Sequence, residues 1–428
     1  FYVSFFPQLV AGPIVRANEF IPQLHKPYFL SRRQFGIAVF WILNGLIKKI
    51  VLSDYIAVNF VDRVFENPLL YSGFENTMAL FGYSLQVYAD FSGYTDIAIG
   101  VAMLMGFYLP TNFNSPYKAK SPGEFWKRWH ISLSKWLQDY LYIPLGGNRN
   151  ATFGTYCIIL TIAAIAVFLS GSWWVAAALA LLSVILLLVA RFRPDKRKKI
   201  TTNLNAMDTM LLGGLWHGAS WNFMIWGGLN GIGMVVYKFW KDWSVTTRTL
   251  VLLALAFALR LLCVYHPAPV FNMFFVWVLC ILVGNAIRLV YNLASGKKEL
   301  PWLRDAWAIL QTFVFITFTR LFFRSGSNLD PAEANETAWN TAKNMVNQIG
   351  SHWDLSLIPN MMVQYRNVFI VIAIGMIIHW LPDRFKRRYR IWFTRMPLPL
   401  MAIVVALAVF VIYQFITADL QSFIYFQF

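Results

Sequence analysis

Charged residues are scarce in this sequence of 428 residues. Asp, Glu, Lys and Arg make up 13% of it, whereas 58% of the residues are hydrophobic and 17% are aromatic. A soluble domain carries about 25% charged residues, so this chain cannot cover a water-soluble surface of the required size. Its apolar content is also too high for an intrinsically disordered chain. The composition therefore predicts a membrane protein.

Cysteine is also scarce, and several motifs of soluble enzymes are missing. The three cysteines, Cys157, Cys263 and Cys280, lie far apart within apolar segments. This spacing excludes a disulfide framework and a zinc site built on closely spaced cysteines. No segment resembles a phosphate-binding loop, a dinucleotide-binding glycine motif or a nucleophile elbow. We therefore expect no metal ion and no bound cofactor.

Acidic residues are outnumbered by basic ones, 20 to 37, which gives a net charge of +17. The bases concentrate in the short segments 191–199 and 383–395, each with six bases and one acid. Such loops face the cytoplasm in membrane proteins, so we favour this topology over a nucleic-acid surface and expect no nucleic-acid partner. We place the segment 325–366 on the outer side, because four acids there outnumber two bases: Asp330, Glu333, Glu336 and Asp354 against Lys343 and Arg366.

Long apolar runs, rather than short alternating strands, predict membrane-spanning helices. Seven runs have about the required length: 153–170, 172–190, 248–265, 269–292, 305–323, 367–381 and 397–418. The glycine-containing stretches 76–109 and 206–240 exceed one span and predict broken helices, hairpins or steeply tilted helices. Lys48 and Lys49 interrupt 35–60 and leave its path open. We expect one all-α polytopic membrane domain over 1–428, preceded by further spans because the chain begins within an apolar run.

His217 lies in the middle of the apolar stretch 206–240. A titratable group at such a position normally faces protein or a water-filled cavity, and a neutral imidazole there can accept a proton from a hydroxyl. Trp216, Ser220 and Asn222 are expected to support it, and nearby glycines allow close approach of a backbone or substrate. The alternative is a histidine that only links helices by hydrogen bonds.

The segment 121–149 predicts an amphipathic helix at the membrane interface. Its apolar arc is rich in tryptophan and its opposite arc carries bases, as expected at headgroup depth. His130 falls at the border of the apolar arc, so we expect it to point towards protein or membrane. The residues alone slightly favour an interfacial histidine without a catalytic role.

Asp90 and Asp96 lie in an otherwise apolar run. Carboxylates within a membrane are functional or tightly paired. These two are expected to hold a histidine, an arginine or a helix break at Gly93, and this structural support is favoured over direct catalysis.

Four segments together resemble the membrane-bound O-acyltransferase (MBOAT) family, most closely its bacterial alginate O-acetylation branch. In chain order they are FFPQLVAGPIVR, YADFSGYTDIAIG, EFWKRWHISLSKWLQDYLYIPLGGNR and LLGGLWHGASWNFMIWGGLNG, and the similarity returns at LFFRSG (321–326) and FIYFQF (423–428). The resemblance implies a ring of transmembrane helices around a central funnel. It also implies that His217 is the essential catalytic histidine and that His130 matches a second family histidine. These two lie 87 residues apart, farther than is usual in the family, so we interpret 153–190 as an inserted peripheral hairpin.

The resemblance further implies an O-acyltransferase of the bacterial inner membrane. We expect it to move an acyl group, with acetyl as the favoured cargo, from a cytoplasmic donor such as acetyl-CoA to hydroxyls of an exported polysaccharide such as alginate. His217 would be the general base, with His130, Asp90 and Asp96 orienting the site. Expected partners are membrane lipids, the polysaccharide and a periplasmic or membrane-anchored acetyltransferase. Four bases either attract the donor phosphates or only set the topology: Lys118, Lys120, Lys127 and Arg128.

Several alternatives stay open. Within the family, the cargo or acceptor can differ, as in peptidoglycan O-acetylation or teichoic-acid D-alanylation. Outside it, broken helices and membrane carboxylates also fit a transporter of lipid-linked sugars. A non-enzymatic assembly scaffold is a third alternative, and it would tolerate the loss of His217.

Overall fold

Helices form every regular element in the residues that the computed structural model describes, which are 1–218, 220–296, 300–327, 333–416 and 423–424. The predicted all-α class is therefore confirmed for this part of the chain. Six of its helices are long and apolar enough to cross a membrane, and one bent pair makes a seventh candidate. The protein is thus a multi-span membrane protein, as its composition predicts.

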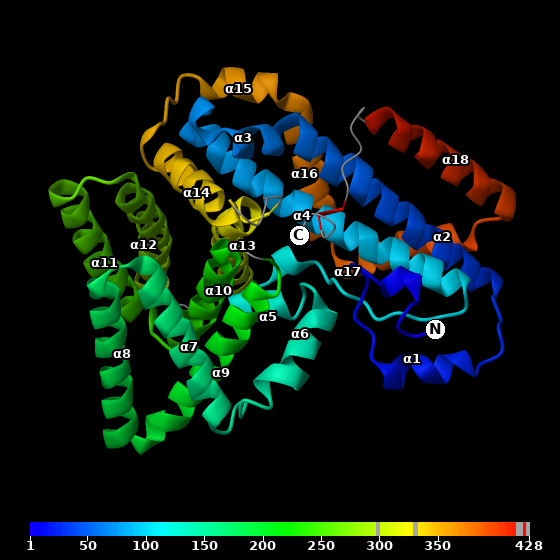
Figure 1. The fold of residues 1–428 in the computed structure, drawn as a ribbon. Helices are drawn as coiled ribbons and strands as arrows, with labels where there is room; N and C mark the ends of the chain where they lie inside the picture. Colours follow the sequence, from blue (N-terminus) through cyan, green and yellow to red (C-terminus); the bar gives the residue numbers. More distant parts are fainter. Residues whose placement is uncertain (219, 297–299, 328–332, 417–422, 425–428) are drawn as a thin grey trace.

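The two longest helical runs lie side by side along much of their length (Figure 1). The first is continuous over Arg32–Glu66 and comprises α2 (Arg32–Leu46), the π-helical segments Ile47–Asp54 and Ala57–Val61, and α3 (Asp62–Glu66). The second is α4 (Gly73–Leu104), which begins with a capping box between Ser72 and Glu75. The interruption expected at Lys48 and Lys49 is therefore absent.

Gly93 is a point of close approach between these two helices. A Cβ atom added at Gly93 would lie 2.8 Å from the carbonyl oxygen of Gly45, so glycine allows the two backbones to approach closely. The helix break considered at Gly93 is wrong, because α4 continues through it. Of the alternatives for 76–109, a broken helix and a hairpin are wrong, because one helix continues to Leu104.

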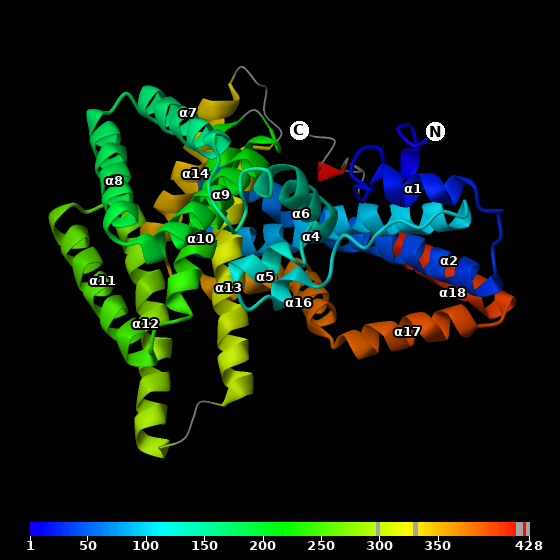
Figure 2. The same cartoon turned by 90° about the horizontal axis from the view of Figure 1, so that it is seen from below.

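The opposite end of the molecule contains α7 (Phe153–Ser170), α8 (Trp173–Phe192), α11 (Val245–Tyr265) and α12 (Pro269–Ser295), as Figures 1 and 2 show. α7 and α8 contact each other and α9 (Pro194–Leu215), and their large apolar side chains are mostly exposed. They thus form two apolar helices at the edge of the molecule, where the hairpin is predicted. That this hairpin is an insertion stays a prediction.

Between these ends lie α10 (Trp221–Trp240), α13 (Pro301–Ser325), α14 (Ala334–Ser351) and the short helices α5 (Pro122–Trp126) and α6 (Ile131–Leu137). α9 and α10 form a hairpin, which is one of the forms expected for 206–240. Aromatic side chains from α4, α5, α10, α13 and the connection between α5 and α6 fill the largest core, among them Tyr83, Phe125, Trp129, Trp226 and Phe323. This aromatic core surrounds the candidate site.

The remaining helices complete the chain: α1 (Ala17–Leu24), α15 (Ile358–Gln364), α16 (Arg366–Trp380), α17 (Asp383–Arg395) and α18 (Leu398–Phe415). α15 and α16 form the bent pair, with an angle of 81°. All seven predicted apolar runs coincide with helices, although the apolar part of α7, Phe153–Phe168, is shorter than a span. α14 is a helix that the sequence analysis did not anticipate within 325–366. Asp330 lies outside the described residues.

Candidate active site

His217 lies in the tight connection between α9 and α10. Glycines bring these helices together, because a Cβ atom added at Gly214 would collide with the carbonyl oxygen of Phe223. The Ser220 hydroxyl then caps α10 by accepting a hydrogen bond from the backbone N–H of Asn222 at 3.2 Å. The connection turns the imidazole inward, and His217 is only 5% exposed.

The hydrogen bond of the His217 ring determines which nitrogen can act as a base. Its Nδ1 lies 2.7 Å from the carbonyl oxygen of Gly213. A carbonyl only accepts, so Nδ1 carries the proton and, in the neutral ring, Nε2 carries the lone pair. Three aromatic rings surround the imidazole edge-on, Trp216 at 4.9 Å, Trp226 at 5.0 Å and Phe323 at 5.4 Å between centroids. This arrangement suits a general base held in one orientation.

His130 lies between α5 and α6, where the sequence predicts the interior of one amphipathic helix. That prediction is wrong, because the helix ends at Trp126 and starts again at Ile131. His130 takes the left-handed conformation, with φ of 44°. Asn112 holds this bend together: its backbone carbonyl accepts from the N–H of Ile131, and its side-chain oxygen accepts from both the N–H and the hydroxyl of Ser132. The expected inward orientation of His130 is confirmed, since it is 3% exposed.

The structure brings the two histidines together around Trp216. The Trp216 ring lies 4.9 Å from His217 and 6.4 Å from His130. Burial lowers the pKa of His130 well below its ordinary value, and the proximity of His217 lowers it further. His130 is therefore neutral at physiological pH. Trp216 itself is 54% exposed, so the pair lies next to the protein surface.

Asn222 supports the site through the packing of its helices. Its side-chain N–H donates to the Ser325 hydroxyl at 2.8 Å and so connects α10 to α13. Ser220 and Asn222 are both buried. Their contacts position the turn that carries His217.

Asp90 and Asp96 pair with the two lysines that the sequence left unexplained. Asp90 lies 2.7 Å from the Lys49 ammonium, and Asp96 lies 2.6 Å from that of Lys48. Asp90 also accepts from the backbone N–H of Ile424 at 2.9 Å. The two carboxylates thus connect α4 to the Arg32–Glu66 helix, and their contacts fit structural support.

Three of the four bases considered for donor binding have protein partners. Lys118 reaches Asp383 at 3.1 Å, Lys120 reaches Asp305 at 2.6 Å, and Arg128 reaches Glu124 at 2.9 Å. Lys127 is exposed. These contacts reduce the net charge that the group would present to a phosphate.

Arg320 is a feature of this site that the sequence analysis missed. It lies on α13, is 1% exposed, and its guanidinium carbon lies 4.0 Å from the centre of the Trp129 ring. The sequence did indicate this residue, because an arginine lies inside the predicted span 305–323 and charged groups within a membrane mark functional sites.

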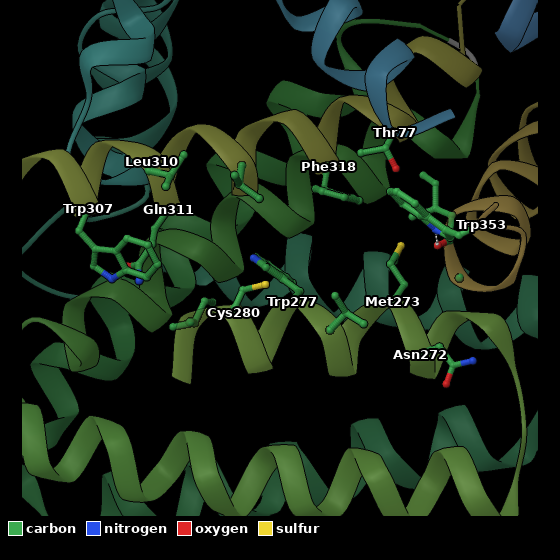
Figure 3. A pocket seen from close by; sticks show the side chains of 15 residues that line it. Thr77, Asn272, Met273, Trp277, Cys280, Trp307, Leu310, Gln311, Phe318 and Trp353 are labelled. Atoms are coloured by element: carbon green, nitrogen blue, oxygen red, sulfur yellow. Dashed lines mark hydrogen bonds between the residues drawn. The ribbon is translucent and has the colours of Figure 1, made fainter. Parts of the chain in front are cut away.

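A separate apolar pocket of about 530 Å³ lies between α12, α13 and α14 (Figure 3). Met273 and Trp277 of α12, Leu310 and Phe318 of α13 and Trp353 line it. None of the predicted site residues belongs to this lining. The predicted central funnel leading to His217 stays a prediction.

The fold and the site define a polytopic helical membrane protein with two buried histidines beside an aromatic core. Residues 1–168 match the model of the membrane-bound O-acyltransferase (MBOAT) family. The predicted family resemblance is confirmed. Residues 425–428, part of the resemblance noted at the C-terminus, lie outside the described residues.

Curated relatives are matched over more than half of the chain. A peptidoglycan O-acetyltransferase of Helicobacter pylori is 39% identical over 55% of this chain and 36% of its own length. A probable alginate O-acetylase AlgI of Azotobacter vinelandii is 36% identical over 55% of this chain and 38% of its own. A teichoic acid D-alanyltransferase of Bacillus subtilis is 24% identical over 57% and 52%. The chain thus spans between about a third and a half of the length of these relatives.

Proposed function

We propose that this protein is a membrane O-acyltransferase that moves an acetyl group to hydroxyls of an exported polysaccharide. The observation that carries the proposal is the His217 imidazole, which is buried between α9 and α10 with Nδ1 held by Gly213. In this mechanism Nε2 takes the proton of the attacking hydroxyl. His130, whose ring lies 6.4 Å from that of Trp216, orients the site.

The match of residues 1–168 to the family model supports acyl transfer, and the relatives support the choice of acyl group. Identity is 35–39% to the relatives named as O-acetylating enzymes and 24–26% to those named as teichoic acid D-alanyltransferases. We therefore propose acetyl as the cargo, with a thioester such as acetyl-CoA as the cytoplasmic donor. The acceptor is alginate or another exported polysaccharide, with peptidoglycan as the alternative that the Helicobacter relative favours.

The multi-span fold supports an enzyme that connects the two sides of a bilayer. We propose the bacterial inner membrane as its location. A periplasmic or membrane-anchored acetyltransferase would complete delivery to the polymer. The exposed apolar side chains of α8, α11 and α18 would contact lipid.

The His217→Ala variant tests the proposal. We expect it to abolish transfer of radiolabelled acetyl groups from acetyl-CoA to polysaccharide in purified membranes, while the protein still inserts and accumulates. His266→Ala is the matched control, because His266 is an exposed histidine next to α11, and it should retain activity. Normal acetylation by the His217→Ala variant would falsify the mechanism. Sugar flux without any acyl transfer would favour the transporter instead.

A further inference from the structure

Arg320 is a buried cation whose donor nitrogens form no hydrogen bond of normal geometry among the described residues. Its side chain is 1% exposed, and Nε, Nη1 and Nη2 have no hydrogen-bond partner within normal distance and angle among the described residues. The buried Tyr117 hydroxyl is the neighbouring polar group, and it already donates to the carbonyl oxygen of Ser84. Arg324, one helical turn later, shows the usual solution, because its guanidinium donates to Asp62 at 3.0 Å. Burial of a charge without such a partner is unfavourable, so Arg320 requires another explanation.

Aromatic rings surround the Arg320 guanidinium on α13. Its central carbon lies 4.0 Å from the centre of the Trp129 ring and within 6 Å of the Phe125, Trp226 and Phe323 rings. Aromatic faces stabilise a cation, but they do not accept hydrogen bonds from all five N–H groups in the guanidinium plane. The aromatic rings thus stabilise the positive charge of Arg320, and its N–H groups remain available to donate hydrogen bonds to a ligand.

Arg320 and His217 share two of these rings. The His217 ring lies 5.0 Å from Trp226 and 5.4 Å from Phe323, and the Arg320 guanidinium carbon lies 5.9 Å and 5.5 Å from the same two centroids. The two groups are also close enough to influence each other electrostatically. A base and a cation thus lie on the same two aromatic rings.

We propose that Arg320 binds the oxyanion that forms on the acyl group during transfer, an inference that rests on the proposed function of His217. The acceptor hydroxyl gives its proton to Nε2 of His217, its oxygen bonds to the thioester carbonyl carbon, and the carbonyl electron pair moves to the carbonyl oxygen. The guanidinium N–H groups hold that oxyanion. When it collapses, the carbon–sulfur bond breaks and the thiolate takes the proton from His217.

The Arg320→Met variant separates this role from a structural one. Removal of an oxyanion donor lowers kcat about 100- to 1000-fold with little change in KM, because the charge exists only in the transition state. The melting temperature should stay the same or rise, since an unpaired buried charge is removed. Arg324→Met is the matched control, and it should lower the melting temperature by leaving Asp62 without its partner. A large loss of stability in Arg320→Met, or kcat close to that of the unaltered protein, would overturn the proposal.

Binding of methylphosphonate tests the site without turnover. This ion has a methyl group and tetrahedral oxygens, like an acetyl group under attack, so it should raise the melting temperature of the unaltered protein and of His217→Gln but not of Arg320→Met. Equal stabilisation of Arg320→Met, or none of the unaltered protein, would overturn the site. If methylphosphonate acts as expected but the unaltered protein transfers no acetyl group, the anion site stands and the proposed function fails.

Discussion

At the scale of single residues, the His130 bend stores backbone strain next to the candidate base. His130 is one of two residues other than glycine with positive φ in the described chain, and both have φ of 44°. Such a conformation persists only where surrounding contacts impose it, and here Asn112 supplies them. The His130 imidazole therefore lies beside the candidate base only because its own backbone adopts an unfavourable conformation.

Replacement of His130 by glycine and by alanine should reveal this strain. A left-handed conformation is about 1 kcal/mol or more less favourable for alanine than for glycine, so His130→Gly should unfold with a free energy about 1 kcal/mol higher than His130→Ala. Both variants should lose activity. Lys135, exposed on α6, is the control, since glycine there should be less stable than alanine. Thermal unfolding in detergent measures each difference, and the same order at both positions would contradict the strain.

At the scale of elements, the buried ion pairs between α4 and the Arg32–Glu66 helix act as specific connections. The Lys48 and Asp96 side chains are 18% and 9% exposed, and Asn44 also donates to Asp96 at 2.6 Å. Removal of one member of such a pair leaves a buried charge without a partner. The pair thus explains why two lysines occur within an apolar helix.

Asp96→Asn should lower the free energy of unfolding by about 3 kcal/mol, because Lys48 loses its counter-ion. The double variant with Lys48→Met should recover most of that loss, since no unpaired charge remains. Arg304→Gln removes an exposed pair, as Arg304 is 56% exposed, and should change stability by less than about 1 kcal/mol. Melting curves in detergent compare the stabilities of the three variants. If the double variant lost as much stability as the two single substitutions together, Lys48 and Asp96 would not act as a pair.

The apolar helices could be predicted closely because the length of an apolar run is a local property. The amphipathic helix over 121–149 could not, since its interruption at His130 depends on Asn112, which lies outside it. Gly93 shows the same limit, because a glycine that breaks a helix and one that allows two helices to approach closely have the same sequence signal. The proximity of His130 and His217 likewise comes from packing around Trp216.

At the scale of the whole molecule, the distribution of charge predicts how the chain crosses the bilayer. The bases of 191–199 and α17 should face the cytoplasm, whereas Asp354 and its acidic neighbours should face outward. α15 and α16 lie between Asp354 and α17, so their bent pair would form the crossing. This orientation determines from which side a donor reaches His217.

Single cysteines introduced at Lys196, Asp354 and Arg387 test this topology, since all three positions are exposed. The native Cys157, Cys263 and Cys280 are first replaced by serine. A membrane-impermeant maleimide added to intact spheroplasts should label only the Asp354→Cys variant, because the bilayer shields cytoplasmic thiols, and lysis should expose all three. Labelling of Arg387→Cys from outside would place α17 on the outer side. The bent pair would then not cross the membrane, and the cytoplasmic entry of the donor would lose its support.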